Sequence, residues 1–583
     1  MKKRIILTIL ALALIISLIS VSAFAGAPVR IVVDGEEVTF EGQPPVLVDG
    51  RVMMPFGDAA MIPLRAAFEG VGYRVAWDNA TQTVELLSPA FRATLPREQS
   101  TNQHLVISVA PLWTLDPVHS GSTQIAQVSS LIHQTLFTYN EDLELVGLLA
   151  EDFEFIDAQT LRVQIRENVL FHDGTILTAD DVAFSLERAA DSPSSVFISG
   201  VIKHVEVVDD LTVIIHLEYP FVPIIATLAH PVNSIISKNQ YETEGEDAIH
   251  YWPVGLGPFM RDEHRILIDI HEELSLIRFD DYFGELPILE SIFFRNNWDS
   301  EIRSAMLEVG KAHLALNLTL EDFLRLSDNP QLNMMNATSW TTNYIGFNHQ
   351  NEYLSNRLVR QAILSAIDMN EINEVVFSGI FETAHGILPE SIWGSIAADL
   401  PGYGFDLERA RMLLAEAGYP DGFSISIWVN DPNMTRLAVA EFVQFHLSAI
   451  NINVEIEMLE WGAYLDLTAH GEHDMFILGW NAATGDPDYA LFPLYHSSNW
   501  GSLGNRSFYE NPEVDRLLEQ AREELNLQRR LDILAEIQAI LFLDASKIYI
   551  NHVEILVGAN ESVRGLRLMP NGLHTIASVY LVD

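Results

Sequence analysis

The sequence predicts an α/β protein made of two or three domains. At 583 residues the chain is too long for one compact core, and its apolar content of 48% is ample for burial. Short runs with the two-residue period of strands alternate with segments of helical period, which is typical of mixed α/β domains. The clearest helical patterns cover residues 125–136, 182–190, 358–368, 407–417, 437–450 and 528–542.

Composition excludes several kinds of partner and chemistry. With Lys+Arg 34 against Asp+Glu 80 the formal net charge is −46, and such a field repels nucleic acid and anionic membranes. The acids are spread along the chain, which fits either a salt- or alkali-adapted surface or a generic acidic one. The chain has no cysteine, so disulfides, thiolate metal sites, a cysteine nucleophile and a lipid-modified N-terminal cysteine are excluded.

The N-terminus has the pattern of a secretory signal peptide, residues 1–25. Basic residues 2–4 precede an apolar run over 5–21, and Ala23 and Ala25 supply the small residues that a signal peptidase reads. The run is short for a membrane anchor. We therefore expect cleavage after Ala25 and export to the cell envelope or beyond it, as a soluble protein.

A small first module is expected at residues 26–90. Strand patterns cover 29–35, 37–41, 73–77 and 83–87, Asp49-Gly50 is a hairpin signal, and residues 63–70 predict a short helix. A polar stretch with Pro89 and Pro96 follows, and we place the linker at 91–103.

This module resembles the N-terminal domain of copper amine oxidases. The resemblance rests on Asp49-Gly-Arg51, Pro63-Leu-Arg65, Phe68-Glu69 and Val75-Ala-Trp-Asp78, and the extra residues 56–62 depart from the family pattern. It implies a small α+β domain and no oxidase chemistry, because the copper and cofactor sites of those enzymes lie in other domains. A spacer or wall-associating role and inert packing are both open.

The rest of the chain, from residue 104, carries a second and more specific pattern. The stretch Arg166-Glu-Asn-Val-Leu-Phe-His-Asp-Gly-Thr-Ile-Leu-Thr-Ala-Asp-Asp-Val-Ala-Phe-Ser-Leu-Glu-Arg188 resembles the signature of extracellular solute-binding proteins that serve oligopeptide, dipeptide and nickel ABC importers. Further landmarks in that family's order are Leu115-Asp-Pro117, Pro253–Phe259, Phe279–Tyr282, Tyr344–Asn348, Leu358–Ile363, Ala410–Gly422, Asn511–Asp515 and Ile537-Gln538. One departure is Leu256, where the family usually has threonine.

The resemblance implies a periplasmic-binding-protein-like fold of two lobes joined by a hinge. Lobe I would comprise residues 104–340 with 556–583, lobe II residues 341–555, and the hinge would lie near Trp340 and Val553. It further implies a non-enzymatic, monomeric receptor that passes a peptide or peptide-like solute to an ABC permease. A nickel-chelate or other non-peptide binder, such as an oligosaccharide binder, and a wall-associated structural protein are the alternatives.

The candidate ligand-binding residues centre on the stretch Gly479–Tyr489, which follows an apolar strand pattern at 474–478. Aromatic, small and carboxylate residues arrive there together, as a pocket requires. Side chains of these kinds also occur in cores and turns, so both readings are open for most of them. The candidate wall residues are Trp113, Thr114, Tyr344, Asn348, Trp461, Trp480, Asn481 and Tyr489.

Three positions concern the charges of the ligand. In peptide binders of the family, an aspartate three residues after the equivalent of Trp480 pairs with the ligand's ammonium group, and this chain has Ala483 there. We expect Asp486 to take over, since Gly485 allows a turn that re-aims it, although Asp486 also suits a turn cap. Asp488 in this role, or a ligand without a free amine at that end, are the alternatives. Arg506 suits either a ligand carboxylate or an internal salt bridge.

Catalytic and metal motifs are weak or absent. The sequence has no Gly-x-Ser-x-Gly, no His-Glu-x-x-His and no phosphate-binding loop with lysine, which disfavours a hydrolase. The pair His470 and His473 flanks a glycine and fits a polar turn better than a chelate. We therefore predict no cofactor and no metal ligand.

Overall fold

The computed structural model describes residues 30–33, 36–37, 46–48, 51–56, 60–63, 74–78, 83–87, 99–262, 264 and 270–583. The chain forms two compact units, a small one (1–99, 327–333 and 582–583) and a large one (100–326 and 334–581). The expected signal peptide and the expected helix at 63–70, apart from Pro63, lie outside the described residues. Within the described ranges, no helix is long and apolar enough to span a membrane.

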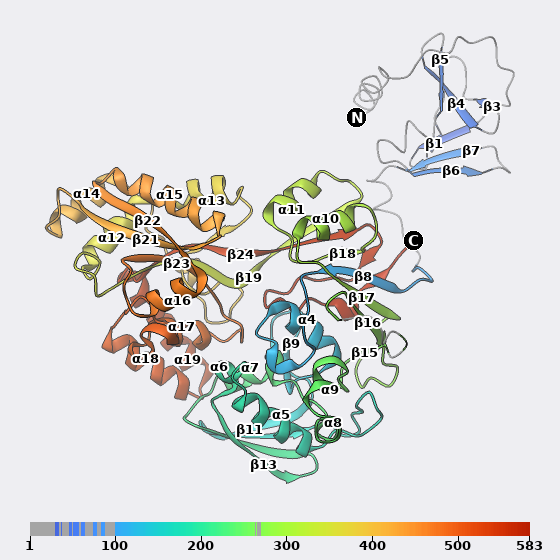
Figure 1. Cartoon of the computed structure of the whole chain (residues 1–583), viewed down its shortest axis with the longest axis horizontal. Coiled ribbons are helices and arrows are strands. Elements are labelled where there is room, and N and C mark those ends of the chain that lie inside the picture. Colours follow the sequence, from blue (N-terminus) through green and yellow to red (C-terminus); the bar gives the residue numbers. More distant parts are fainter. Residues whose placement is uncertain are drawn as a thin grey trace. The chain divides into compact units, whose positions relative to one another are not determined.

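The small unit contains two sheets. One has the order β2-β1-β7-β6 and the other β3-β4-β5 (Figure 1). Val48 pairs with Arg51, which agrees with the hairpin signal predicted between them, and Asp49-Gly50 itself lies outside the described residues. Within the extra residues 56–62, Phe56 pairs with Ala60. The strands are β1 (Arg30–Val33), β2 (Glu36–Glu37), β3 (Val46–Val48), β4 (Arg51–Phe56), β5 (Ala60–Pro63), β6 (Arg74–Asp78) and β7 (Thr83–Leu87).

The large unit is organised around one eleven-stranded sheet of order β15-β16-β17-β8-β18-β24-β19-β23-β21-β22, with β20 paired to β24. In Figure 1, the long strands β19 (Leu332–Phe347) and β24 (Lys547–Asn560) run side by side across its middle. The other strands are β8 (His104–Val109), β15 (Phe259–Arg261), β16 (Glu273–Arg278), β17 (Ser291–Asn296), β18 (Leu314–Ala315), β20 (Glu382–Thr383), β21 (Phe423–Asp431), β22 (Ile452–Glu460) and β23 (Met475–Asn481).

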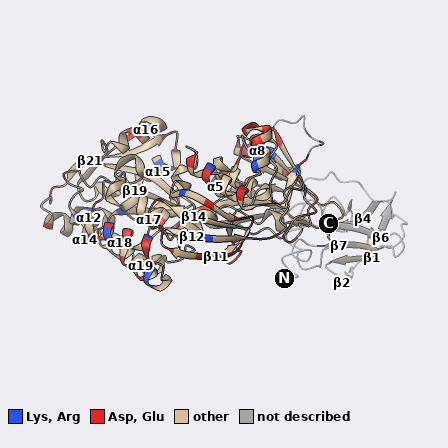
Figure 2. Cartoon of the chain, turned by 90° about the horizontal axis from the view of Figure 1, so that it is seen from below, with Lys and Arg blue, Asp and Glu red and all other residues tan. Residues whose placement is uncertain are grey.

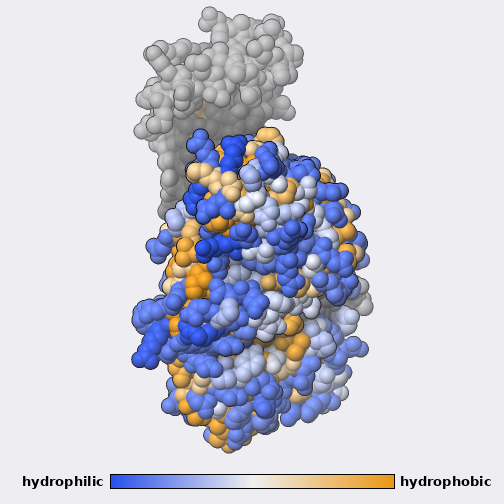
Figure 3. Space-filling model, turned by 90° about the vertical axis from the view of Figure 1, so that its left-hand side faces the viewer, coloured by the Kyte–Doolittle hydropathy of each residue, from blue (hydrophilic) through white to orange (hydrophobic). Residues whose placement is uncertain are grey.

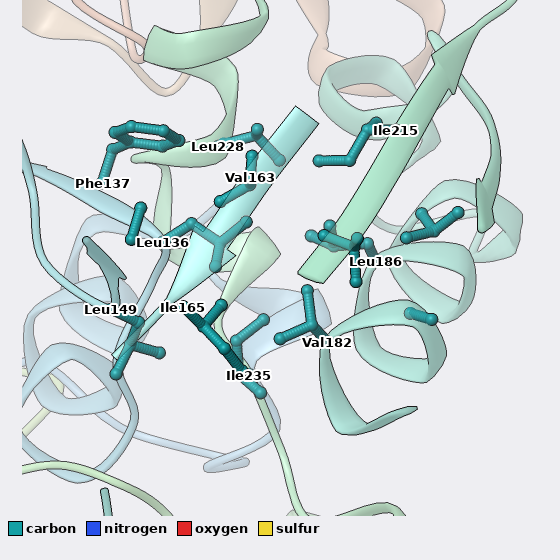
Figure 4. Packing of buried hydrophobic residues seen from close by; sticks show 14 of the residues in the cluster. Leu136, Phe137, Leu149, Val163, Ile165, Val182, Leu186, Ile215, Leu228 and Ile235 are labelled. Carbon is teal, nitrogen blue, oxygen red and sulfur yellow. The ribbon is translucent and has the colours of Figure 1, made fainter. Parts of the chain in front are cut away.

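A separate four-stranded sheet, of order β11-β12-β14-β13, packs on helix α5. Figure 4 shows its core, where Val163 and Ile165 of β12 and Ile215 of β14 face Val182 and Leu186 of α5. The strands are β11 (Ala150–Asp157), β12 (Thr160–Ile165), β13 (Ile202–Asp209) and β14 (Thr212–Leu217), and small two-stranded ladders join β9 (Phe137–Tyr139) to β10 (Leu145–Gly147) and β25 (Val563–Arg564) to β26 (Tyr580–Leu581).

Buried apolar residues divide the large unit into two lobes. We call lobe I the part built on the cores of residues 105–316 and 557–581, and lobe II the part built on residues 340–550. The helices before β19 are α4 (Thr123–Ile132), α5 (Ala179–Asp191), α6 (Val196–Ser199), α7 (Ile224–Leu228), α8 (Lys238–Glu244), α9 (Glu246–Tyr251), α10 (Ser300–Glu308) and α11 (Leu320–Ser327).

Lobe II has larger helices, and they cover the β19-β23-β21-β22 part of the sheet. They are α12 (Arg357–Ala366), α13 (Met369–Val376), α14 (Leu407–Glu416), α15 (Met434–Ser448), α16 (Trp461–Ala469), α17 (Asp488–Tyr495), α18 (Pro512–Glu523) and α19 (Leu527–Leu543). All six helices predicted from periodicity are present, and Thr178 and Asp181 form the expected capping box before α5.

The surface of the large unit is acidic and mixed. Figure 2 shows Asp and Glu positions scattered over both lobes, in line with the even spread of acids in the sequence. On the face shown in Figure 3, hydrophobic residues are dispersed among hydrophilic ones. Lone exposed apolar side chains of this kind are normal for a protein surface.

Two buried ion pairs hold the turn after β23. Both oxygens of Asp486 accept hydrogen bonds from Arg530 at 2.7 Å, and both side chains are 4% exposed. Asp488 accepts from Arg522 at 2.7 and 2.9 Å. Because α18 carries Arg522 and α19 carries Arg530, the turn is fixed to both helices of lobe II.

Gly485 allows the turn to pass close to lobe I. Its φ of +73° favours glycine, and a Cβ there would lie 2.5 Å from the Trp340 ring and 2.6 Å from the Tyr139 hydroxyl. The same hydroxyl donates to the Thr484 carbonyl at 2.7 Å. The turn is therefore shaped by a close approach of the two lobes.

Several histidines of the large unit are buried in the neutral form. His172 Nδ1 accepts the Gly255 N–H at 3.1 Å, His574 Nδ1 accepts the Met569 N–H at 3.2 Å, and His230 makes a similar contact with a neighbouring N–H. Burial lowers the pKa of each of these three imidazoles to about 4. Protonation would both charge a buried ring and remove the acceptor of a backbone N–H.

Removing one partner of the Asp486–Arg530 pair should destabilise the protein strongly. We expect Asp486→Asn to lower the free energy of unfolding by about 3–5 kcal/mol, because Arg530 would keep a buried and unpaired charge. Glu513→Gln, which breaks the exposed Arg516–Glu513 pair, should have a much smaller effect, because solvent screens that pair. Chemical denaturation measures both, and equal effects would contradict the assignment of the buried pair.

The buried histidines should make the protein sensitive to acid. Their folded pKa of about 4 lies below the unfolded value of about 6.5, so the unfolded state binds protons first as the pH falls. Their stabilisation is complete above pH 6.5 and is lost towards pH 4, by about 3 kcal/mol each. Urea denaturation at pH 7 and pH 4.5 should show the loss, and His172→Gln should flatten it. An unchanged free energy of unfolding at the two pH values would refute this account.

Candidate functional site

A small pocket lies between the two lobes. Lobe II contributes Asn481, Ala483 and Thr484 from the end of β23 and the turn after it. Lobe I contributes Ser120, Gly121, Thr123, Ala126, Tyr139, Ala229, His230, Pro231, Asn571 and Leu573. Segments far apart in the sequence therefore form a single cavity.

The pocket lining is polar and uncharged. Among the described residues, no Asp, Glu, Lys or Arg lines it, and burial keeps His230 neutral by lowering its pKa to about 4. The Ser120 hydroxyl is buried and has no hydrogen-bond partner within the described part of the chain. Such a group is costly to bury alone, so Ser120 is available to a ligand in this pocket.

Trp480 and Tyr489 face the other lobe through an aromatic contact. The Trp480 indole N–H donates to the Tyr489 carbonyl at 2.8 Å, and the two rings are 6.1 Å apart. Phe197 of α6, an exposed lobe I residue, has its ring 6.1 Å from Trp480 and 5.8 Å from Tyr489. The sequence analysis missed Phe197, which no motif distinguishes from other exposed phenylalanines.

Trp113 and Trp461 are exposed, by 48% and 44%, but neither lines this pocket. Trp461 begins α16 and stacks on Tyr464, with ring centroids 5.8 Å apart. Thr114 is buried, and its Oγ1 lies 2.6 Å from His250 Nδ1. These three predicted wall residues thus lie apart from the cavity between the lobes.

Tyr344 and Asn348 lie in the interior of lobe II, and their prediction as cleft-wall residues is corrected. Tyr344 is fully buried in β19 beside Phe476, because its register places it on the packed face of the sheet. The Asn348 amide donates to the carbonyls of Gly471 and His473, both at 2.9 Å. Asn348 therefore closes a loop and offers nothing to the cleft.

Asp486 also has a structural place. Its two oxygens are taken by Arg530, it is buried, and it does not line the pocket, whereas Ala483 and Asn481 do. The expected transfer of the ammonium-binding role from position 483 to Asp486 is therefore not supported. The turn-cap alternative fits, since Asp486 Oδ1 also accepts the Asp488 N–H at 2.9 Å.

Arg506 forms no salt bridge with the described residues, and its guanidinium is not left open for a ligand carboxylate. It donates to the Leu465 carbonyl at 2.5 Å and to Thr468 Oγ1 at 3.0 Å, in the second half of α16. Arg436 of α15, which the sequence analysis did not single out, donates to Asn430 Oδ1 at 2.6 Å. Within the described chain, neither guanidinium pairs with a carboxylate.

These two arginines have similar surroundings. Burial lowers the pKa of Arg436 and of Arg506, and only the neighbouring hydroxyls of Tyr344 and Tyr464 oppose the effect. Nearby, Lys547 is fully buried, which lowers its pKa to about 7, and its Nζ lies 5.4 Å from the centre of the Tyr344 ring. Lobe II thus brings three basic side chains together around Tyr344, and none of them pairs with a carboxylate of the described residues.

His470 and His473 lie in different environments. His473 is buried against Phe476, with ring centroids 4.8 Å apart, and burial lowers its pKa to about 4. His470 is exposed at the end of α16 beside Asp466. The two rings do not form a chelate in this structure.

Comparisons with known proteins agree with the geometry. Residues 32–96 match the copper amine oxidase N-terminal domain, and residues 144–502 match the middle region of the bacterial extracellular solute-binding proteins, family 5. The glutathione-binding protein GsiB of Escherichia coli K12 is 30% identical over 472 residues, which cover 79% of this chain and 90% of GsiB. GsiB of Salmonella typhi is 31% identical over 469 residues and is covered to the same extent.

Solved structures show the same two-lobed fold. HbpA2 from Haemophilus parasuis superposes with a TM-score of 0.76 at 29% identity, over 82% of this chain and 100% of its own. DppA from Helicobacter pylori, in complex with the peptide STSA, gives a TM-score of 0.67 at 28% identity, over 82% and 98%. With more than half of its length matched by the family pattern, the chain belongs to family 5 of the bacterial extracellular solute-binding proteins.

Proposed function

We propose that this protein captures a peptide or peptide-like solute between its lobes and delivers it to the permease of an ABC importer. The observation that carries the proposal is the pocket between the lobes, to which each contributes wall residues on a family 5 fold. The relatives support the class of ligand, since GsiB is named for glutathione and DppA was solved with a peptide. The protein acts without catalysis.

The lobes close about the two long strands. We place lobe I at 104–340 with 556–583 and lobe II at 341–555, so the hinge lies near Trp340 of β19 and Val553 of β24. Neighbouring strands of one sheet can bend together at these points while each lobe keeps its own core. The closed form, with Phe197 against Trp480 and Tyr489, is the form that the permease receives.

The ligand end near Ala483 carries no free ammonium group. Ala483 supplies no carboxylate, Asp486 is committed to Arg530, and no other acidic residue of the described chain lines the pocket. A buried ammonium without a counter-charge is strongly disfavoured. The solute is therefore acylated, cyclic or otherwise uncharged at that end.

An acidic group of the solute binds to lobe II. Arg436 Nη2 lies 3.9 Å from the position that a Cβ of Gly479 would occupy, next to Trp480 at the end of β23. Arg436 lies outside the lining of the pocket and has no carboxylate partner in the described chain, so it suits a ligand carboxylate that extends beyond the pocket, which it can hold with two hydrogen bonds. Arg506 shares the tyrosine neighbours of Arg436 and adds to the positive potential there.

The signal peptide and the small N-terminal domain have separate roles. Residues 1–25 direct export and are removed, and no cysteine is available for a lipid anchor. The small domain at 26–90 serves as a spacer or wall-associating module, separated by the linker 91–103. The mature protein works as a monomer in the cell envelope.

Mass spectrometry of the solute that co-purifies with the exported protein tests the proposal directly. We expect a peptide-like acid, and adding it to stripped protein should raise the melting temperature, because it binds only the folded form. Arg436→Gln should weaken its binding by about tenfold or more, while the exposed Arg516→Gln should not. A bound metal chelate or oligosaccharide, or no stabilisation by any peptide, would overturn the peptide assignment.

Position 483 should decide whether a free N-terminus is accepted. We expect Ala483→Asp to tighten the binding of short peptides with a free ammonium group by about tenfold or more, by supplying the missing counter-charge. The same peptides with an acetylated N-terminus are the control, and their affinity should not rise. Calorimetric titration gives both affinities. If the wild type already prefers the free amine by that margin, the ammonium is recognised elsewhere.

A further inference from the structure

A group of potential metal ligands lies in lobe I, outside the pocket. Asp116 lies within the Leu115-Asp-Pro117 motif, His119 ends the short turn Pro117–His119, and His250 comes from α9. One ligand atom from each lies within 4.8 Å of the others. Asp116 is fully buried and the two histidines are half-buried, so the group lies at the base of a surface site rather than free in solvent.

The surrounding hydrogen bonds orient His250 towards this group. Thr114 Oγ1 lies 2.6 Å from His250 Nδ1 and accepts the Asp116 N–H at 3.1 Å. With Nδ1 engaged, Nε2 faces Asp116 Oδ2 at 4.0 Å, and the His119 ring stacks on the His250 ring with centroids 5.5 Å apart. Metal-binding histidines are commonly held by their other ring nitrogen in this way.

The charges near the group also allow a cation. Arg188 donates to both oxygens of Asp116, at 2.9 and 2.5 Å, and to Glu246 at 3.0 Å. Two carboxylates therefore surround one guanidinium, and the local balance is negative while the imidazoles are neutral. Arg188 fixes the orientation of the Asp116 carboxylate and leaves a lone pair of Oδ2 towards the histidines.

We propose that Asp116, His119 and His250 form a binding site for a divalent ion of the zinc class. Two imidazole nitrogens and one carboxylate oxygen are the donor set that Zn²⁺ and its first-row neighbours prefer, with a fourth position left for water. The ligand atoms lie within 4.8 Å of one another and would move closer around an ion, because bonds from zinc to nitrogen and oxygen are about 2.0–2.2 Å long. The ion would join the turn at 113–120 to α9, and Ser120 of that turn lines the pocket between the lobes.

The test uses the full exported chain without an affinity tag, stripped with a chelator and titrated with ZnCl₂ by calorimetry. We expect one site per chain, a rise in the melting temperature on addition of Zn²⁺, and visible absorption bands with Co²⁺ in its place. His119→Ala and His250→Ala should each weaken Zn²⁺ binding by more than about tenfold. The matched control is His204→Ala with His216→Ala, an exposed pair with centroids 6.2 Å apart and no place in this group.

Metal-free melting curves of each variant establish that it folds as the wild type does. The proposal is overturned if the wild type binds no stoichiometric Zn²⁺ at micromolar concentrations. It is equally overturned if the variant lacking both His119 and His250 side chains retains wild-type affinity, or if the control pair accounts for the binding.

Discussion

The hydrogen-bonded pair of β19 and β24 is the constraint on which the rest of the large unit depends. These strands are the only neighbours in the sheet order that join the strands of lobe I to those of lobe II, among the described residues. Their junction is fixed by His552, whose Nδ1 donates to Thr342 Oγ1 at 2.9 Å while that hydroxyl donates to the Ile387 carbonyl at 2.8 Å. Burial keeps His552 neutral by lowering its pKa to about 4, so the contact persists through physiological pH.

The turn after β23 lies next to this strand pair and forms a wall of the pocket. β23 pairs with β19, so the end of β23 comes out beside the junction and meets lobe I. Arg522 and Arg530 then hold the carboxylates of the turn inside lobe II. Both carboxylates are used to fix the backbone of the turn, so the side chains that remain to contact a solute are neutral. The lack of charge in the pocket is therefore a consequence of how its wall is stabilised.

Much of the fold could be predicted because its signals are local. Helices α12, α14, α15 and α19 follow from the spacing of apolar residues, and the antiparallel pairing of β3 with β4 follows from the turn signal between them. The two lobes came from a family resemblance, since β19 and β24 are separated by 199 residues that no periodicity connects. A pairing between such distant strands is set by tertiary packing.

The site was less predictable because burial and pairing are not local. Tyr344 and Trp480 are both aromatic residues near strand ends, yet one is in the core and the other faces lobe I. From the sequence, Asp486 was a reasonable candidate for binding the ligand's ammonium group. The structure pairs it instead with Arg530, which is 44 residues away. Phe197 and Ser120 belong to the site only because the lobes meet, and no pattern in their own segments indicates it.

The excess of acid in this chain gives its unpaired cations particular weight. With 80 acidic and 34 basic residues, a buried arginine has many carboxylates to choose from, and Arg188 binds two while Arg522 and Arg530 bind one each. Arg436 and Arg506 bind backbone or amide oxygens instead, although desolvation of an unpaired guanidinium is costly. A solute carboxylate that pairs with one of these guanidinium groups would offset this cost. The solute would therefore gain affinity from a charge that has no partner in the ligand-free protein.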